Sequence, residues 1–401
     1  MSARAAKPPA PATVTVAESM DAIDPAQWDR VANPDPAKYD PFVSHAFLLA
    51  LEQSGSIAPD TGWWPRHLLI HAEDGALAAA MPSYLKSHSM GEFVFDHGWA
   101  DAYERAGVDY YPKLLSAVPV TPVPGRRFLV GPGRDAAALQ QTLTAGAIEL
   151  TRRLHASSLH VTFLDPAQVP AAEAQGLLHR TGHQYHFTNN GYGSFDDFLA
   201  SLASRKRKNL KRERRDALAG GISIEWLTGA DIRKEHWDAF FAFYLDTGGR
   251  KWGSPYLNRK FFTLLGATMA KDCLLVLAKR EGRYIAGALN MIGAEALYGR
   301  YWGCIEHHPF LHFEVCYYQA IDFAIARGIA RVEAGAGGEH KLVRGYEPMT
   351  THSVHWVADP RFRRAIADYL ERERAHVERQ GEAMAEMTPF RKDLTRNSDE
   401  D

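Results

Sequence analysis

The chain has 401 residues, more than one ordinary hydrophobic core accommodates, so we expect two domains. Hydrophobic residues make up 46% of it and charged residues 23%, as in ordinary globular proteins, and the net charge of -2 excludes a global attraction to nucleic acid or anionic membranes. The three cysteines (Cys273, Cys304 and Cys316) are widely spaced without a Cys-x-x-Cys motif, which indicates a reducing compartment and excludes a disulfide framework or a thiolate zinc site.

Both ends of the chain are predicted to lie outside the folded part. Residues 1–16 are rich in Ala and Pro and lack the apolar core of a signal peptide, which predicts a disordered leader. Residues 391–401 predict a solvated acidic tail. No stretch approaches about eighteen uninterrupted apolar residues, so we predict no membrane span and a cytoplasmic location.

Two stretches resemble each other at a separation of about 207 residues. Residues 68–72 match 274–278, and after an acidic-Gly turn in each, residues 77–81 match 285–289. Further on, Gly98 aligns with Gly303, and Tyr110-Tyr111 with Tyr317-Tyr318. Each copy predicts three meandering strands and then an amphipathic helix, although two similar hairpins also arise by chance.

The elements of the second copy are sharply defined. We predict a helix over 310–327 that stops at Gly328, followed by a short strand over 331–333. The three strands before it are predicted over residues 273–279, 283–292 and 296–303. In the first copy the third strand is predicted to end before Asp96. Between the copies lies a helical insertion over about 194–220, then a strand over 222–226, and the chain closes with a charged helix over 360–386.

The strongest local anomaly is a basic run within the insertion. Eight of the eleven residues 205–215 are Arg or Lys. Charge runs are usually solvated helix faces. Eight like charges on three helical turns repel one another, however, so a bound polyanion such as tRNA is the better explanation. We expect Arg207, Lys208, Lys211 and Arg212 to contact its phosphates.

The loop after the third strand of the second copy is a poor coenzyme A site. Such a site needs a glycine-rich turn whose N–H groups hold the pyrophosphate. Gly303 is present, but Ile305 replaces the second glycine and the acidic Glu306 follows. This favours a donor other than acyl-CoA.

The helix that follows carries candidate chemistry. His308 and His312 share a helical face, yet no third ligand stands at a recognisable spacing, so we predict polar cleft residues and no metal. Glu314 is a candidate for proton transfer, because partial burial would favour its protonated form. A satisfied structural carboxylate is an equal alternative.

Residues 333–341 leave a strand through a glycine-rich turn. Lys341 and Arg344 make it a candidate anion clamp, and His340 titrates in a range suited to proton transfer. A flexible surface turn is the alternative. Arg250, Lys251 and Trp252 form a basic-aromatic patch suited to a ribose phosphate or adenine.

In the first copy, a cluster follows the predicted third strand. Asp96, Trp99, Asp101 and Tyr103 are candidates for binding an acceptor amine, because carboxylates orient ammonium groups; turn and capping roles are equally good explanations. No G-x-S-x-G or H-E-x-x-H motif occurs, so triad or zinc hydrolysis is not supported.

Several of these segments together resemble one bacterial family. Residues 93–107, 249–262, 311–325 and 332–348, including His-Phe-Glu at 312–314 and Gly-Glu-His-Lys at 338–341, resemble the FemAB-like predicted N-acyltransferases. The resemblance extends over about residues 40–390. It implies an α/β, duplicated GNAT-like fold and N-acyl transfer. We expect no cofactor. Distant similarity to Fem-type transferases implies aminoacyl-tRNA, or another phosphate-rich donor, as a partner. It also implies an amine, such as that of a cell-wall precursor, as the acceptor.

We therefore expect a first lobe over 17–190, the basic insertion over 191–221 and a second lobe with the C-terminal helix over 222–390. Within the second lobe, Glu314 or His340 is expected to move the proton. Two other functions stay open: an acyl-CoA or acyl-carrier N-acyltransferase, and a non-catalytic protein that binds RNA or a cell-wall precursor.

Overall fold

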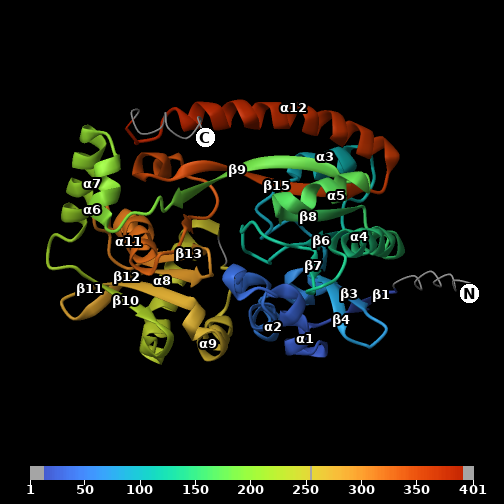
Figure 1. Ribbon diagram of the computed structural model, residues 1–401, viewed down its shortest axis with the longest axis horizontal. Helices are drawn as coiled ribbons and strands as arrows, with labels where there is room; N and C mark the ends of the chain where they lie inside the picture. The colour runs from blue at the N-terminus through green and yellow to red at the C-terminus, as the bar shows by residue number, and fades with distance from the viewer. Residues whose placement is uncertain (1–12, 253–254, 392–401) are drawn as a thin grey trace, which may run out of the picture.

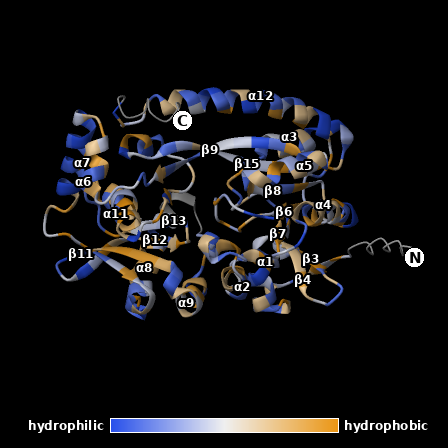
Figure 2. Ribbon diagram, in the orientation of Figure 1, coloured by the Kyte–Doolittle hydropathy of each residue, from blue (hydrophilic) through white to orange (hydrophobic). Residues whose placement is uncertain are grey.

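The computed structural model describes residues 13–252 and 255–391. Figure 1 shows two lobes side by side, joined by the long strands β9 (Leu178–Thr188) and β15 (Glu347–Val357). Helix α12 (Pro360–Ala385) runs across the top of both lobes. Hydrophobic residues concentrate in inner strands, whereas the surface helices α7 (Ser204–Ala217) and α12 are largely hydrophilic (Figure 2).

The first lobe contains thirteen helices and strands, apart from short 3-10 turns, among the described residues. In chain order these are β1 (Val14–Ala17), α1 (Pro25–Ala32), α2 (His45–Gln53), β2 (Trp63–Pro65), β3 (His67–His71), β4 (Leu77–Met81), β5 (Tyr84–Lys86), α3 (His97–Arg105), β6 (Lys113–Ser116), β7 (Leu129–Val130), α4 (Ala136–Arg153), β8 (Ser158–Leu164) and α5 (Val169–Ala174).

The second lobe follows β9 along the chain. It consists of α6 (Phe195–Ser201), α7 (Ser204–Ala217), β10 (Ser223–Thr228), α8 (Lys234–Trp252), α9 (Arg259–Thr268), β11 (Cys273–Arg280), β12 (Arg283–Ile292), β13 (Ala296–Cys304), α10 (Leu311–Phe313), a π-helical turn η8 (Glu314–Tyr318), α11 (Gln319–Arg327), β14 (Arg331–Glu333) and a 3-10 turn η9 (Glu339–Arg344). The segments α10, η8 and α11 form one continuous stretch of helix.

The strands form a small sheet, with the order β1-β3-β4-β7, and a large sheet that continues through both lobes. The order in the large sheet is β10-β11-β12-β13-β14-β9-β15-β8-β6-β5-β2. Strand β9 follows the first lobe but pairs with β14 of the second, while β15 follows the second lobe but pairs with β8 of the first. At the centre of the sheet β9 and β15 pair with each other, with Gly182 opposite Thr351. The two units thus exchange their last strands.

Both faces of the second lobe's strands are covered. Along β11, Leu275 and Leu277 pack with the side chains of α8 and α9, while Leu274 and Val276 pack with those of α11. This alternation puts successive side chains on opposite faces of the strand. Each fully buried Leu or Val contributes about 1.5–3 kcal/mol of transfer free energy, so the apolar run of β11 fixes a central strand.

The predicted elements of the second copy agree closely with the structure. Strands β11, β12 and β13, the helix that ends before Gly328 and α12 all begin and end within one or two residues of the predicted bounds. Gly328 has a φ of 65°, the left-handed conformation that ends a helix.

The later part of the first copy was predicted wrongly. Residues 93–95 are not a strand, since Phe93 has a φ of 60°, and Asp96 is instead the N-cap residue of helix α3. Tyr110 and Tyr111 lie in the loop before β6, so the helix that corresponds to α10–α11 is α4. The insertion between β4 and β7 hid this correspondence.

The predicted leader was too long. Val14–Ala17 form β1, which pairs with β3, so the fold begins before residue 17; residues 1–12 lie outside the described part. At the other end, the N–H of Arg391 donates to the carbonyl of Ser201 (3.0 Å), so residue 391 contacts the fold and residues 392–401 lie outside the described part.

Candidate functional site

Helix α7 is fastened to the second lobe by two buried ion pairs. Arg214 donates to both carboxylate oxygens of Glu314 (2.9–3.2 Å) and to Asp322 (2.6 Å). One residue earlier, Glu213 accepts two hydrogen bonds from the Nη2 of Arg344 (2.9 and 3.0 Å). Both pairs are at most about one-fifth exposed. Charged hydrogen bonds of this kind hold α7 in one position against η8.

Glu314 is fully buried in this contact. Besides Arg214, the side-chain amide of Gln319 donates to its Oε1 (2.6 Å). Three N–H donors therefore surround the carboxylate of Glu314, and two of them belong to the guanidinium of Arg214. Its geometry is that of a carboxylate that positions α7, the alternative that the sequence left open.

The glycine-rich turn before η9 is rigidly held. Lys341 is 3% exposed and donates to the carbonyls of Ala334 (2.8 Å) and Gly335 (3.0 Å). Burial lowers the pKa of Lys341 to about 8. Arg344 is 4% exposed, donates to the carbonyl of His340 (2.6 Å) and lies 3.4 Å above the ring of Phe313. Lys341 and Arg344 therefore bind the protein itself in this structure.

His340 differs from its neighbours because it is exposed. One ring nitrogen lies 3.0 Å from the hydroxyl of Tyr317, and the ring packs on Phe313 (5.6 Å between centroids). His312 lies on the same aromatic patch, 6.3 Å from His340. Among the predicted proton-transfer residues, His340 is the one that the fold presents to solvent.

The other cations of α7 point outward. Lys208, Lys211 and Arg212 are exposed and Arg207 is half-buried, and Lys211 contacts Asp196 (3.0 Å) on the surface. The predicted polyanion surface thus stays available. Arg250, Lys251 and Trp252 end helix α8, but their side chains lie outside the described residues.

Strands β13 and β14 separate partway along β13. They pair in parallel only from Ala296 to Tyr298, and β13 then continues to Cys304 paired with β12 on its other side. At its end lies a cavity of about 360 Å³, lined by residues that include Trp302, Cys304, His307 and His312.

Glu306 also lines this cavity. The hydrogen bond from His308 (3.0 Å), with the charges of Arg280 (3.2 Å) and Arg283 (3.3 Å), lowers the pKa of Glu306. A carboxylate therefore occupies the position where a coenzyme A site needs N–H donors.

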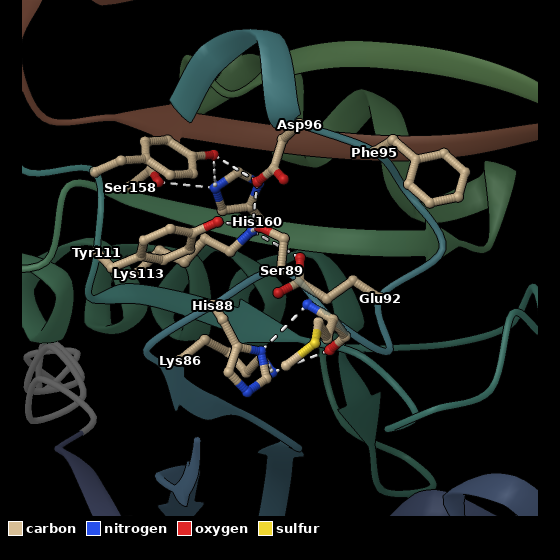
Figure 3. A network of polar contacts seen from close by, with 12 residues as sticks. Lys86, His88, Ser89, Glu92, Phe95, Asp96, Tyr111, Lys113, Ser158 and His160 are labelled. Carbon is tan, nitrogen blue, oxygen red and sulfur yellow. Dashed lines mark hydrogen bonds and ion pairs between the residues drawn. The ribbon is translucent and has the colours of Figure 1, made fainter. Parts of the chain in front are cut away.

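A second cluster of charges lies inside the first lobe (Figure 3). Lys86 on β5 and Lys113 on β6 are directly opposite each other, and neither is exposed. Like charges in this position destabilise a sheet unless they are compensated. Lys113 donates to Glu92 (2.8 Å) and also contacts Asp96, whereas Lys86 lies 3.4 Å from the ring centroid of Trp63.

Burial sets the protonation of this cluster. It lowers the pKa of Lys86 to about 7 and raises that of Glu92 to about 7, although the neighbouring opposite charges resist both changes. Burial alone would raise the pKa of Asp96. The charge and the hydrogen bond of Lys113 have a larger effect and hold the pKa of Asp96 well below its ordinary value. The hydroxyl of Tyr110 donates to the same carboxylate (2.6 Å).

Two histidines extend the network. The Nε2 of His160 forms a hydrogen bond with the hydroxyl of Ser158 (2.7 Å), and its Nδ1 forms one with the Nδ1 of His355 on β15 (2.8 Å). Both rings are almost completely buried. Burial, together with the charge of Lys113, lowers the pKa of His160 to about 3. The network thus contacts both the first lobe and the exchanged strand.

The predicted acceptor residues do not form one site. Asp96 lies in the buried network, Asp101 is exposed, and Tyr103 stacks on Phe362 of α12 (3.8 Å between centroids). Trp99 packs edge-on against His355 (5.0 Å). Trp99 and Tyr103 therefore fill the small core under α12.

Sequence reasoning missed five residues of this network. They are Lys86, Glu92, Lys113, His160 and His355. The visible signal was weak: charged residues within the strands β5 and β6, at positions that face the protein interior. No spacing rule joins them, because they come from four different strands and one loop.

A larger cavity of about 570 Å³ lies between the loops 93–95 and 336–339, beside β9 and α12. Over residues 13–252 and 255–391, no three or more His, Cys, Asp and Glu side chains form a group that could hold a metal ion. No helix in that same part of the chain is long and apolar enough to cross a membrane.

Comparison with solved structures establishes the fold. FemX is 15% identical in sequence, with a TM-score of 0.53 and coverage of 86% of this chain and 98% of that one. The C-terminal domain of a putative lysylphosphatidylglycerol synthetase from Agrobacterium fabrum is 9% identical (TM-score 0.50; 86% and 96% covered). A Bacteroides thetaiotaomicron protein of unknown function is 11% identical (TM-score 0.51; 86% and 100% covered). Identities this low establish a common fold alone.

No curated protein sequence matches the chain significantly. The family model called FemAB-like, described as peptidoglycan biosynthesis/recognition, matches residues 19–392. The match covers nearly the whole described chain and confirms the family and the duplicated GNAT-like α/β fold that the sequence motifs predicted. The chain belongs to the FemAB-like family.

Proposed function

We propose that this protein is an N-acyltransferase that moves an aminoacyl group from a phosphate-rich donor, aminoacyl-tRNA, onto an amine. A cytoplasmic location fits this donor. The proposal extends the family assignment to a specific donor and to named residues.

The attachment of α7 carries the proposal. Its inward residues Glu213 and Arg214 fasten it to η8 and η9 through buried ion pairs, while Lys208 and Arg212 remain exposed. A purely solvated charged face needs no such attachment. A polyanion bound to the exposed side would be held at a fixed distance from His340, because Arg344 contacts both Glu213 and the backbone of His340.

The loop at the end of β13 supports the same donor. Glu306 lies there in place of the glycine-rich turn whose N–H groups hold the pyrophosphate of coenzyme A, and it is paired with Arg280 and Arg283. An acyl group on a tRNA ribose needs no pyrophosphate site. Its phosphates bind instead along an extended basic surface.

His340 is the proposed proton-transfer residue. The amine nitrogen attacks the ester carbonyl carbon, so that a carbon–nitrogen bond forms and the bond to the ribose oxygen breaks. The amine loses one proton and the leaving ribose oxygen gains one, and a single imidazole can carry out both transfers. The hydroxyl of Tyr317 orients this ring. Glu314 has the positioning role.

The activity is tested with tRNA charged with radiolabelled amino acids and a mixture of small amines. Transfer converts an alkali-labile ester into an alkali-stable amide, so alkali-resistant label measures turnover. Label that appears from acyl-CoA, and not from charged tRNA, would contradict the donor assignment.

Donor binding is tested separately by the salt dependence of RNA affinity. The double variant Lys208→Gln/Arg212→Gln should reduce the log–log slope by about 1.5, because each lost phosphate contact removes about 0.7–0.9. The matched control, Arg364→Gln/Arg372→Gln, removes two exposed charges from α12 and should leave the slope unchanged. Equal slopes in both double variants would refute binding at α7.

A further inference from the structure

The loop between β5 and α3, residues 87–96, is held in place by side chains. Through Phe93, Val94 and Phe95 it forms part of the wall of the 570 Å³ cavity. Within the described part of the chain, no backbone–backbone hydrogen bond joins residues 88–95 to another segment. Segments that lack such bonds are the ones that open locally at low free energy.

Lys113 of β6 binds three residues of this loop. Its ammonium group donates to the Oγ of Ser89 (2.7 Å) and to the Oε2 of Glu92 (2.8 Å), and it also contacts Asp96. Figure 3 shows these three side chains gathered around Lys113, while Phe95 points away from them. The three residues are spread over the length of the loop, so a single ammonium group joins its two halves. We therefore expect the loop to open as a unit.

Lys86 of β5 is covered by the same loop. Its ammonium group donates to the carbonyl of Met90 (3.2 Å), lies 3.3 Å from the Nδ1 of His88 and lies 3.4 Å from the ring centroid of Trp63. The Nε2 of His88 donates to the carbonyl of Thr61 (2.9 Å), so its Nδ1 is the acceptor for Lys86. Because Lys86 is not exposed in the closed loop, opening brings its ammonium group into contact with water.

The second half of the loop has two further features that bear on opening. Phe93 has a φ of 60°, in the left-handed region that residues with a side chain rarely adopt, and an open loop relaxes this residue. Arg180 of β9, which is paired with Glu373 of α12, donates to the carbonyl of Phe95 (2.8 Å). This contact joins the loop to the strands between the two lobes.

We propose that residues 87–96 form a gate on the first-lobe side of the cavity, that the gate opens as a unit, and that it is held more firmly as the pH rises above 7. When it opens, Phe93 and Phe95 leave the cavity wall and Lys86 becomes hydrated. The gate is a property of the cavity wall and does not depend on the proposed function.

The direction of the pH dependence follows from Lys86. Burial lowers its pKa to about 7 in the closed loop, against an ordinary 10.5 when it is hydrated. Between these values only the open form holds the proton, so a rising pH favours the closed form. From pH 8.5 to pH 7, Lys86 alone should raise the opening equilibrium constant about 16-fold.

Glu92 acts in the opposite direction. Burial raises its pKa from 4.5 to about 7 in the closed loop, although the charges of Lys113 and Lys86 resist the change. The open form of Glu92 is fully ionised over this range, which halves the expected effect to about eightfold. His88 is neutral above pH 7, because burial and the charge of Lys86 lower its pKa.

The titratable neighbours on the other elements keep one charge state between pH 7 and pH 8.5. The charges of Glu92 and Asp96 outweigh burial and raise the pKa of Lys113, which in turn holds the pKa of Asp96 well below its ordinary value against the effect of burial. Burial raises the pKa of Tyr110, in the loop before β6, well above its ordinary value and lowers that of His160 on β8 to about 3. Each of these groups therefore contributes the same charge at both pH values.

Native-state proteolysis with chymotrypsin measures the opening, because cleavage after Phe93 or Phe95 tracks the population of the open loop. Mass spectrometry identifies the cleavage sites. The rate at each pH is divided by that of a free peptide of residues 86–97, which corrects for the protease itself. This relative rate should be about eightfold higher at pH 7 than at pH 8.5. Equal relative rates at the two pH values would overturn the proposal.

Three variants of the intact chain test the role of the lysines. Lys86→Met retains the volume of the side chain and should remove the excess cleavage at pH 7, whereas Lys260→Met, at an exposed position, should retain it. Lys113→Met removes the contacts to both halves of the loop and should raise the relative rate at least about tenfold at pH 8.5. An unchanged rate in Lys113→Met, or a pH dependence that survives Lys86→Met, would overturn the proposal. If Lys113→Met does not fold, the wild-type pH profile and Lys86→Met decide.

Cleavage outside the loop separates the gate from global unfolding. Phe163 on β8 is 5% exposed and is cut only when the first lobe itself unfolds. Cleavage confined to residues 87–96 supports a gate. Cleavage after Phe163 at the same rate and with the same pH dependence would show that the loop does not open by itself, and would overturn the proposal.

Discussion

Lys86 allows the electrostatics of the first lobe to be tested without any substrate. Burial lowers its pKa from an ordinary 10.5 to about 7. At about 1.4 kcal/mol per pKa unit, this difference corresponds to about 5 kcal/mol in the free energy of unfolding, lost when Lys86 is protonated in both states. Below pH 7 the folded and unfolded chains both hold the proton. Between pH 7 and 10.5 only the unfolded chain holds it, so stability rises with pH in that window.

The substitution Lys86→Met retains the volume of the side chain and removes the titration. The difference in unfolding free energy, wild type minus variant, should therefore increase by about 3 kcal/mol between pH 7.5 and pH 10. Urea denaturation at four pH values in this window measures it. Subtraction cancels the titrating groups that the charge of Lys86 does not influence, whereas Glu92, whose pKa that charge lowers, adds a contribution at the low-pH end of the window. Lys260→Met removes the same charge at an exposed position and serves as the control. A wild-type-minus-variant difference that changes by less than about 1 kcal/mol would refute the reasoning.

Three further predictions concern the second lobe. Arg214→Met should destabilise the fold by about 3–5 kcal/mol, because Glu314 is left buried and unpaired. In urea denaturation, adding Glu314→Gln to this variant should recover part of the loss. Strictly additive effects of the two substitutions would contradict the ion-pair argument. Acetyl-CoA should show no saturable binding in calorimetry because Glu306 lies at the loop, and a micromolar site would reverse the donor assignment. His340→Ala should lower turnover by about 10²–10⁴ with folding intact, whereas Tyr317→Phe should have a smaller effect; near wild-type turnover in His340→Ala would place the chemistry elsewhere.

The second lobe was largely predictable from sequence because its signals are local. The Glu281-Gly282 turn separates β11 from β12, an apolar run fills each strand, and Gly328 ends the helix in a left-handed conformation. The pairing of β15 with β8 was not predictable, since strand partners nearly two hundred residues apart leave no local pattern. The first copy failed where a long insertion separates β4 from β7.

The candidate site was predictable only in part, for a similar reason. Arg214 and Arg212 look alike in a basic run, but one is paired with Glu314, a hundred residues away, and the other is exposed. Docking of the helix decides which charge is structural. Lys86 and Lys113 lack any sequence signature because their relationship is a strand register, which forms only in the folded sheet.

The exchange of strands makes the two halves of the chain mutually dependent. A cut in the exposed turn between Gly220 and Gly221 would give an N-terminal fragment that carries β9 without its neighbour β14, and a C-terminal fragment that carries β15 without β8. Each fragment would expose a long unpaired edge that only the other can cover. The single chain is in effect a fused, domain-swapped heterodimer, and its halves should regain structure by complementation when they are mixed and not when they are made alone.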